Sequence, residues 1–275
     1  MNYSHYLFEV PSAWLDRTVL IDAGSDRSYT YGELQLSVQR LAGYLRGLGF
    51  EAGDVVTTHL YNGAAAVIAH LAIQYLGGVP CLLDPLITEA GLHYYMEDTK
   101  ARGLITRCIK EDIHKYVPEN IILLEDRDVE RLSSVEPPSG MPGTAWEYGP
   151  DDLAAIFYTS GTTSQPKGVM LSPANFDAHY RIFTQCCYTY QPGDRLLCFV
   201  PFSHGYGSKS IFIPCLKAGA AMVIMRSFHP VRVAELVKKY DITHLFGVPS
   251  HFQQLLRKQE FVTAMRKLKA AFSAA

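Results

Sequence analysis

The residues best suited to chemistry lie in one polar run at 159–168. Its hydroxyl side chains can donate hydrogen bonds to an anion, and a lysine follows them closely. The run reads Thr159, Ser160, Gly161, Thr162, Thr163, Ser164, Gln165, Pro166, Lys167, Gly168. An apolar, strand-like stretch at 153–158 leads directly into it. Because a strand that feeds a glycine-containing loop exposes backbone N–H groups at its mouth, we predict a phosphate-binding loop with Lys167 as its charged residue.

This loop differs from the Walker pattern, in which a glycine precedes Lys-Ser/Thr. Pro166 stands where that glycine would fall, and Gly168 follows the lysine in place of a hydroxyl residue. On spacing alone, the alternative interpretation is a polar surface turn that connects two strands.

The run resembles the signature Thr-Ser-Gly-Thr-Thr-Gly-x-Pro-Lys-Gly of the adenylate-forming (AMP-binding) superfamily, which includes acyl- and aryl-CoA synthetases, luciferases and the adenylation domains of peptide synthetases. Ser164 replaces one glycine, and the other fixed positions match. The resemblance implies that the loop holds the β- and γ-phosphates of ATP, which arrives with Mg²⁺, and that Lys167 is catalytic. The nucleotide-binding residues would be Thr159, Ser160, Gly161, Thr162, Thr163, Ser164, Lys167 and Gly168.

A second candidate group follows a predicted strand at 195–200. It contains a lone histidine, His204, in the run Pro-Phe-Ser-His-Gly-Tyr-Gly. A lone loop histidine is more often structural than functional, but ligands of open α/β sheets bind where strands end. The run resembles the Phe-His-x-x-Gly motif of CoA synthetases and luciferases, whose histidine borders the acyl pocket and the path of the thiol. This implies a catalytic His204 and a substrate site at Phe202, His204, Gly205 and Tyr206.

The same region indicates the substrate class. Relatives that activate amino acids carry an aspartate there to pair with the substrate ammonium, whereas no acidic residue lies between Arg195 and Met225. We therefore expect a carboxylic acid without an α-ammonium group, such as a fatty or aryl acid, and a role in fatty acid metabolism.

Composition limits the alternatives. The 275 residues carry a net charge of −2, which gives no electrostatic case for nucleic acid or an anionic membrane. No apolar run reaches the ~18 residues that span a bilayer, and residues 1–10 do not read as a signal peptide. The six cysteines include no C-x-x-C pair, and the ten histidines lack zinc-site spacing, so we expect reduced thiols, a cytoplasmic location and no structural metal.

Apolar periodicity supplies the framework. Thr30 and Glu33 have capping-box spacing before a helix that ends near Gly47, and Asn62 is the predicted cap of an alanine-rich helix to residue 76. Strands and helices then alternate to the end of the sequence. The run Gly77-Gly78-Val79-Pro80-Cys81-Leu82-Leu83-Asp84-Pro85 resembles a further landmark of the superfamily, a Gly-x-x-x-Pro-x-x-Pro region; an ordinary strand bounded by turn residues is the alternative. The alternation and the resemblance predict an α/β fold with two stacked mixed or parallel sheets flanked by helices.

The expected division has three parts. We predict a first α/β lobe at 1–132, a connection rich in Pro, Gly and Ser at 133–150, and a second lobe at 151–275 that carries the phosphate loop.

The superfamily's adenine-stacking loop, ribose-binding aspartate and C-terminal lid lysine find no match in this sequence. We therefore expect the N-terminal portion of a ligase that is inactive by itself. Its parent would convert an acid and ATP into acyl-AMP and pyrophosphate, and would then transfer the acyl group to CoA or to the pantetheine of an acyl carrier protein. Two alternatives stay open: a catalytically inactive nucleotide- or acyl-binding remnant that acts through a partner, and a plain α/β binding module.

Overall fold

The computed structural model describes residues 3–118, 121–136, 144–159 and 165–274. These form two compact units, which are described separately. Unit 1 contains Met1–Glu9, Leu34–Tyr61 and Ala65–His179, and unit 2 contains Val10–Glu33, Asn62–Ala64 and Tyr180–Ala275.

Unit 1 is built on a sheet that has six strands among the described residues, in the order β6-β5-β3-β4-β7-β8. The first five strands are parallel, and the edge strand β8 is antiparallel to β7. The strands are β3 (Val55–His59), β4 (Val79–Leu82), β5 (Gly103–Thr106), β6 (Ile122–Glu125), β7 (Ala155–Thr159) and β8 (Lys167–Leu171). The helical segments are α1 (Tyr3–Phe8), α2 (Tyr31–Gly47), α3 (Ala64–Tyr75), α4 (Glu89–Thr99), η2 (Ile113–Lys115), α5 (Asp126–Leu132) and α6 (Pro173–Cys186), of which α2, α3 and α6 include residues of unit 2.

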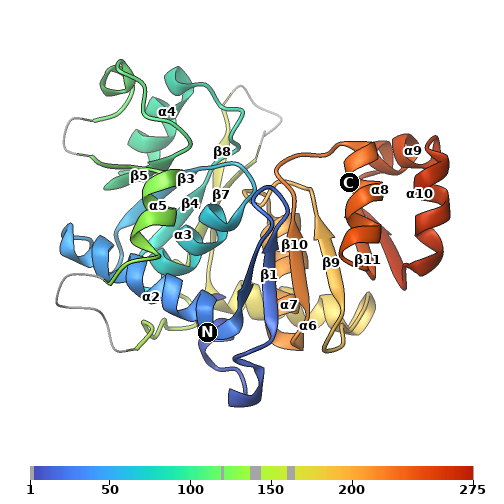
Figure 1. Ribbon diagram of the computed structural model, residues 1–275. Helices are drawn as coiled ribbons and strands as arrows, with labels where there is room; N and C mark the ends of the chain where they lie inside the picture. Colours follow the sequence, from blue (N-terminus) through green and yellow to red (C-terminus); the bar gives the residue numbers. More distant parts are fainter. Residues whose placement is uncertain (1–2, 119–120, 137–143, 160–164, 275) are drawn as a thin grey trace. The chain divides into compact units, whose positions relative to one another are not determined.

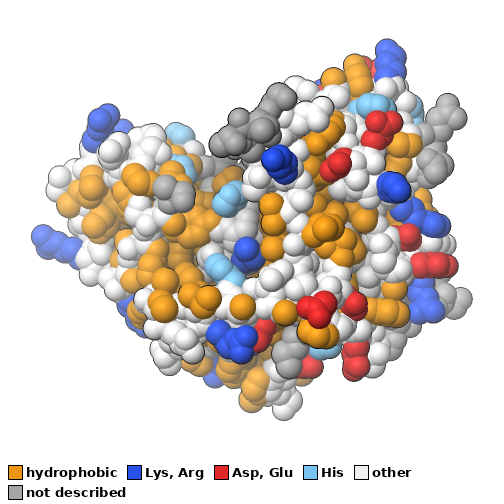
Figure 2. Space-filling view, turned by 180° about the vertical axis from the view of Figure 1, so that it is seen from behind, with side chains coloured by type: hydrophobic (Ala, Val, Ile, Leu, Met, Phe, Trp, Pro, Cys, Tyr) orange, Lys and Arg blue, Asp and Glu red, His pale blue; other side chains and the backbone are white. Residues whose placement is uncertain are grey.

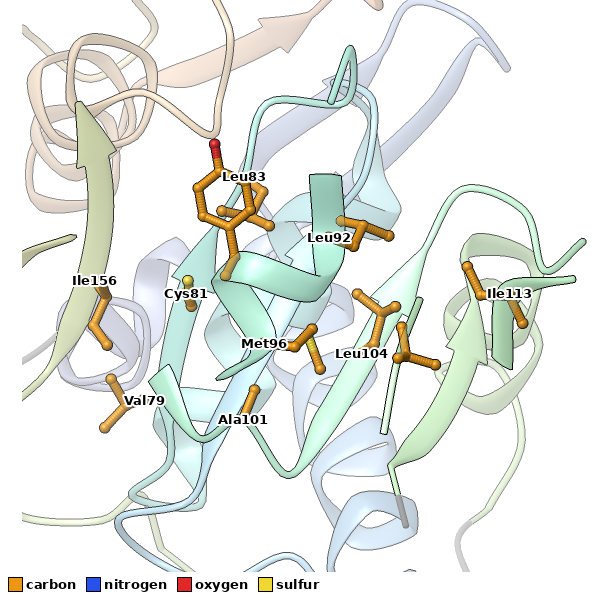
Figure 3. Packing of buried hydrophobic residues seen from close by; sticks show 11 residues of the cluster. Val79, Cys81, Leu83, Leu92, Met96, Ala101, Leu104, Ile113 and Ile156 are labelled. Carbon is orange, nitrogen blue, oxygen red and sulfur yellow. The ribbon is translucent and has the colours of Figure 1, made fainter. Parts of the chain in front are cut away.

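Apolar side chains of α4 hold that helix against the sheet. Leu92 and Met96 point from the helix toward the strand residue Leu104 (Figure 3), and Cys81 of β4 belongs to the same buried cluster. Ile156, from the strand that leads into the phosphate loop, belongs to the same buried cluster. The core of unit 1 therefore joins α4 to β7.

Local sequence signals set several of these elements. The Glu33 carboxylate accepts the N–H of Thr30 at 2.8 Å, and the Thr30 hydroxyl accepts the N–H of Glu33 at 3.2 Å, as the capping box predicts. Gly77, in the turn before β4, has a φ of +84°. A Cβ there would lie 2.6 Å from Cγ of Trp146, so only glycine fits.

Unit 2 contains the second sheet, again with six strands among the described residues, in the order β12-β11-β9-β10-β1-β2. All neighbouring pairs are parallel except β1 with the edge strand β2 (Figure 1). The strands are β1 (Thr18–Asp22), β2 (Arg27–Thr30), β9 (Arg195–Cys198), β10 (Ala221–Ile224), β11 (His244–Gly247) and β12 (Ala270–Ser273). The helical segments are η1 (Ser12–Trp14), η3 (Tyr206–Phe212), α7 (Ile213–Ala218), α8 (Pro230–Lys239), α9 (Pro249–Leu256), α10 (Gln259–Ala264) and η4 (Met265–Lys267).

The α/β fold with two sheets flanked by helices is confirmed, but the strands are grouped differently from the predicted lobes. Both β7 and β8 follow the 133–150 connection, yet β7 pairs with β4 in the first sheet. Conversely, β1 and β2 come from the start of the chain and lie in the second sheet. Pairing between distant segments, which composition does not encode, decides this division. Residues 137–143 of the connection lie outside the described residues.

The predicted cap of α3 is wrong. The carboxylate of Asp22, at the end of β1, accepts the N–H of Ala64 at 2.8 Å and takes the role expected of Asn62. The amide of Asn62 instead forms hydrogen bonds with backbone groups that follow β9 and β10.

On the face drawn in Figure 2, acidic and basic side chains are interspersed among hydrophobic ones. Within the described residues, no helix is long and apolar enough to cross a membrane.

Three buried histidines make the free energy of unfolding depend on pH. Burial lowers the pKa of His59 to about 4, of His70 to about 3 and of His244 to about 4. In the unfolded chain each titrates near 6.5, so below that pH the unfolded state binds protons that the folded state refuses. The contribution of these histidines to the free energy of unfolding is thus fully present above pH 6.5 and is lost as the pH falls toward 4. We expect each histidine to lower the free energy of unfolding by about 2 kcal/mol when the pH falls from 7 to 5.

Urea unfolding at the two pH values measures this loss. A His70→Leu variant should show a smaller drop than the parent chain, whereas the same change at the exposed His114 should leave the drop unchanged. An equal drop in the His70→Leu variant would show that this histidine does not carry the pH dependence.

Candidate functional site

Strands β7 and β8 hold the two ends of the predicted phosphate loop. They are antiparallel, with Thr159 opposite Lys167 and Tyr158 opposite Gly168. Thr159 and Lys167 are both exposed at the end of this pair. Ser160, Gly161, Thr162, Thr163 and Ser164 lie outside the described residues. The structure therefore brings the first and the charged residues of the loop face to face.

Helix α4 contacts both strands at this point. The Tyr94 hydroxyl donates to the carbonyl oxygen of Pro166 at 2.8 Å. The Tyr158 hydroxyl donates to the carboxylate of Asp98. Burial and this bond raise the pKa of Tyr158, so its hydroxyl stays protonated and acts as the donor.

The two ends of the loop, Thr159 and Lys167, lie at the edge of the sheet where ligands of open α/β folds bind. In the parallel strands β3 to β7 this is the carboxyl edge, and the loop directly follows β7. A hollow of about 710 Å³, lined in part by Phe50, Leu76 and Trp146, borders the segments that precede β3 and β4. It therefore lies toward the opposite edge and is separate from the loop.

The second candidate group, in unit 2, follows β9. Nδ1 of His204 accepts the N–H of Tyr206 at 3.1 Å. The neutral ring therefore carries its proton on Nε2, and the side chain is exposed. Such an Nε2–H can donate a hydrogen bond to a substrate oxygen.

Asn62 holds this loop in place. Its Nδ2 donates to the carbonyl oxygens of Val200 at 2.8 Å and Met225 at 3.2 Å, and its Oδ1 accepts the N–H of Phe202 at 2.7 Å. One side chain thus ties the segment after β9 to the end of β10.

The other predicted substrate residues are placed differently from one another. Phe202 is 2% exposed and packs edge-on against Phe212 at 5.7 Å, so its side chain is part of the core. The Tyr206 hydroxyl donates to the carbonyl oxygen of Phe272 at 3.2 Å, and burial raises its pKa to about 12. Gly205 is partly exposed beside His204.

Tyr206 also begins the π-helix η3, an irregularity that is frequent at functional sites. In its first turn, a Cβ on Gly207 would lie 2.5 Å from the carbonyl oxygen of Pro201. This close approach folds the chain back directly after His204.

Comparisons with known proteins identify the family. The family of AMP-binding enzymes matches residues 7–275. The chain belongs to this family.

Curated relatives of this chain include 4-coumarate-CoA ligase 1 of Narcissus pseudonarcissus, which is 30% identical over 92% of the chain and 48% of its own length. A 4-coumarate–CoA ligase of Solanum tuberosum is 30% identical over 86% of the chain and 45% of its own length. The chain therefore spans about half the length of the curated relatives it matches.

Solved structures share the fold. Apo MatB from Rhodopseudomonas palustris superposes with a TM-score of 0.87 at 24% identity, covering 100% of this chain and 55% of that one. A benzoate CoA ligase from Burkholderia xenovorans gives 0.82 at 23% identity, covering 95% and 53%.

In this member of the AMP-binding family the predicted site residues fall into two groups: Thr159, Lys167 and Gly168 belong to unit 1, and His204 with its neighbours belongs to unit 2. Sequence reasoning missed Asn62, Tyr94 and Asp98. What marks these three residues is a hydrogen bond to a segment that is distant in the sequence, and no local sequence pattern reveals such a bond.

Lys209 was missed as well, although a local signal existed: it is a lone charge in an otherwise uncharged stretch at 196–216. Its side chain passes over the loop, since a Cβ on Gly205 would lie 2.8 Å from its Cε. Burial lowers the pKa of Lys209. A half-buried ammonium beside His204 can attract an anion.

Proposed function

We propose that this chain is the N-terminal part of an ATP-dependent acid–thiol ligase. The carboxylate of the acid attacks the α-phosphorus of ATP, an acyl-AMP forms, and pyrophosphate leaves. A thiol then attacks the acyl carbon, and AMP leaves. The observation that carries the proposal is the pairing of Thr159 with Lys167 at the carboxyl edge of a parallel sheet, in a chain that matches the AMP-binding family over nearly its whole length.

The chemistry requires charge neutralisation, because an anionic carboxylate must approach an anionic triphosphate. A lysine at the loop can hold the β- and γ-phosphates and stabilise the pyrophosphate that leaves. We propose this role for Lys167, with hydroxyl donors from Thr159, Ser160, Thr162, Thr163 and Ser164 and backbone contacts at Gly161 and Gly168. Magnesium enters as part of the nucleotide substrate and offsets further phosphate charge.

The acid is proposed to bind beside His204 in unit 2. The Nε2–H of His204 and the ammonium of Lys209 are groups that favour a carboxylate. The named acids of two relatives, 4-coumarate and benzoate, are aromatic, which supports an aryl acid over a fatty acid.

The acceptor is proposed to be CoA, because the relatives are named CoA ligases, with a carrier-protein pantetheine as the alternative thiol. A cytoplasmic location is supported by free cysteines alone. Burial raises the pKa of Cys81 and Cys198 to about 12, which keeps both as protonated thiols.

Acid-dependent exchange of pyrophosphate into ATP by the full-length ligase tests the proposal. We expect more exchange with 4-coumarate or benzoate than with octanoate, and little with phenylalanine, because an α-ammonium would be buried near Lys209 without a carboxylate partner. Efficient activation of free amino acids, with the other acids inert, would overturn the substrate assignment. Absence of exchange with every acid, together with retained ATP binding, would favour a nucleotide-binding remnant.

A further inference from the structure

The edge strand β8, which carries Lys167, is held mainly by its ladder with β7. Lys167, Gly168, Val169 and Met170 are exposed, and the strand pairs on one side with β7. The ladder between β8 and β7 ends at the Thr159–Lys167 pair, and both residues of that pair are exposed. Contacts beyond the ladder therefore decide how firmly the backbone at Lys167 is held.

Helix α4 supplies such a contact at the residue directly before the lysine. The Pro166 carbonyl, which accepts the 2.8 Å bond from Tyr94, belongs to the same peptide unit as the Lys167 nitrogen. Since a peptide unit is planar and rigid, fixing this oxygen also fixes the Lys167 nitrogen.

A second contact holds the other strand. Tyr158 donates to Asp98, one turn further along α4, and its ring lies edge-on to Tyr95 with centroids 4.6 Å apart. Opposite it, a Cβ on Gly168 would lie 3.3 Å from Cζ of Tyr158, so the absence of a side chain there lets the ring stay close to β8.

The helix itself is firmly seated. Tyr95 is 9% exposed and belongs to the same core cluster as Leu92 and Met96. The path from the core of unit 1 to the lysine is therefore short: core, helix α4, Tyr94, the Pro166–Lys167 peptide.

We infer that Tyr94 and Asp98 are positioning residues that hold Lys167 in place for the nucleotide phosphates. This inference rests on the function proposed above. Neither residue needs to touch ATP; each acts through the strands that frame the loop.

Limited proteolysis tests the structural half of the inference without any catalysis. Trypsin can cleave after Lys167 once β8 opens, and when opening and closing are fast the cleavage rate follows the open population. Tyr94→Phe should speed this cleavage about fivefold, the change expected for loss of one neutral hydrogen bond of about 1 kcal/mol. Tyr44→Phe is the matched control, since the Tyr44 hydroxyl donates to a backbone carbonyl, that of Glu136, at 2.7 Å elsewhere in unit 1. It should leave cleavage at Lys167 unchanged.

Kinetics of the full-length ligase test the functional half. Tyr94→Phe should raise the KM for ATP about fivefold and leave the KM for the acid unchanged. Asp98→Ala should act in the same direction. Asp98→Asn should behave nearly like the parent enzyme, because its amide oxygen still accepts the Tyr158 hydroxyl.

The outcomes separate this inference from the proposed function. Unchanged cleavage and unchanged KM for ATP in Tyr94→Phe, with a strong effect of Lys167→Ala, would overturn the positioning role and leave the proposed function standing. Faster cleavage with no change in KM for ATP would also overturn it. If Lys167→Ala itself leaves ATP kinetics unchanged, both fail.

Discussion

Replacing Lys167 with alanine in the full-length ligase is expected to lower kcat/KM for ATP in the adenylation step by about ten- to hundredfold. A charge-assisted hydrogen bond contributes about 1.5–3 kcal/mol, and this lysine is proposed to make one to the phosphates that leave as pyrophosphate. Because the charge on the departing group grows in the transition state, part of the loss should appear in kcat.

Pyrophosphate exchange at varied ATP concentration measures the effect. Thr162→Ala and Thr163→Ala should each lower the rate less, since they remove neutral donors. Lys238→Ala removes a charge from an exposed position on α8 and should leave the rate unchanged. If both threonine changes reduce the rate more than loss of the lysine does, Lys167 is not the principal phosphate ligand.

Local patterns in the sequence predicted most elements of the fold. The spacing of Thr30 and Glu33 predicted the start of α2, because both partners of a capping box lie within one turn. The apolar stretch before Thr159 predicted β7 for a similar reason: its signal is the composition of the strand itself.

The grouping of strands into sheets was beyond such patterns. Whether β7 pairs with β4 or with a strand nearer in sequence is decided by packing between distant segments. The same limit explains the error at Asn62. Its position before α3 has the sequence of a helix cap, but Asp22 reaches that helix end from β1 through the fold.

The candidate site shows the same contrast. The resemblance carried by residues 159–168 located Lys167, and that around His204 located the second loop. The resemblance also suggested Phe202 as a substrate residue, yet its 2% exposure places the ring in the core of unit 2. A residue's presence in a motif does not reveal which way its side chain points. Here the local backbone is set by the close packing of Gly207 against the Pro201 carbonyl and by the π-helix after His204, and neither can be read from the motif.

Asn62→Ala is expected to lower the free energy of unfolding by about 3 kcal/mol, because it removes three hydrogen bonds of about 1 kcal/mol each. The partners left behind are backbone groups at Val200, Phe202 and Met225. Urea unfolding at pH 7 measures the change. Asn175→Ala is the matched control: in the exposed first turn of α6 the Asn175 amide oxygen accepts the N–H of Ser172 at 3.0 Å and its hydroxyl at 3.3 Å, and because this site is solvated the loss should cost only about 1 kcal/mol.

The same substitution should also disturb the site, because the segment that Asn62 holds leads directly to His204. In the full-length ligase, variants that still fold should show a higher KM for the acid or a slower transfer to the thiol, while the KM for ATP stays near that of the parent. Asn62→Asp separates the contributions: its carboxylate can still accept the N–H of Phe202 but can no longer donate to the two carbonyls. The Asn62→Asp variant should therefore lower the free energy of unfolding by more than the contribution of one hydrogen bond, since its negative charge lies against two carbonyl oxygens. A drop in stability for Asn62→Ala no larger than that for Asn175→Ala, with unchanged acid kinetics, would show that the loop at His204 is held by its own packing and not by Asn62.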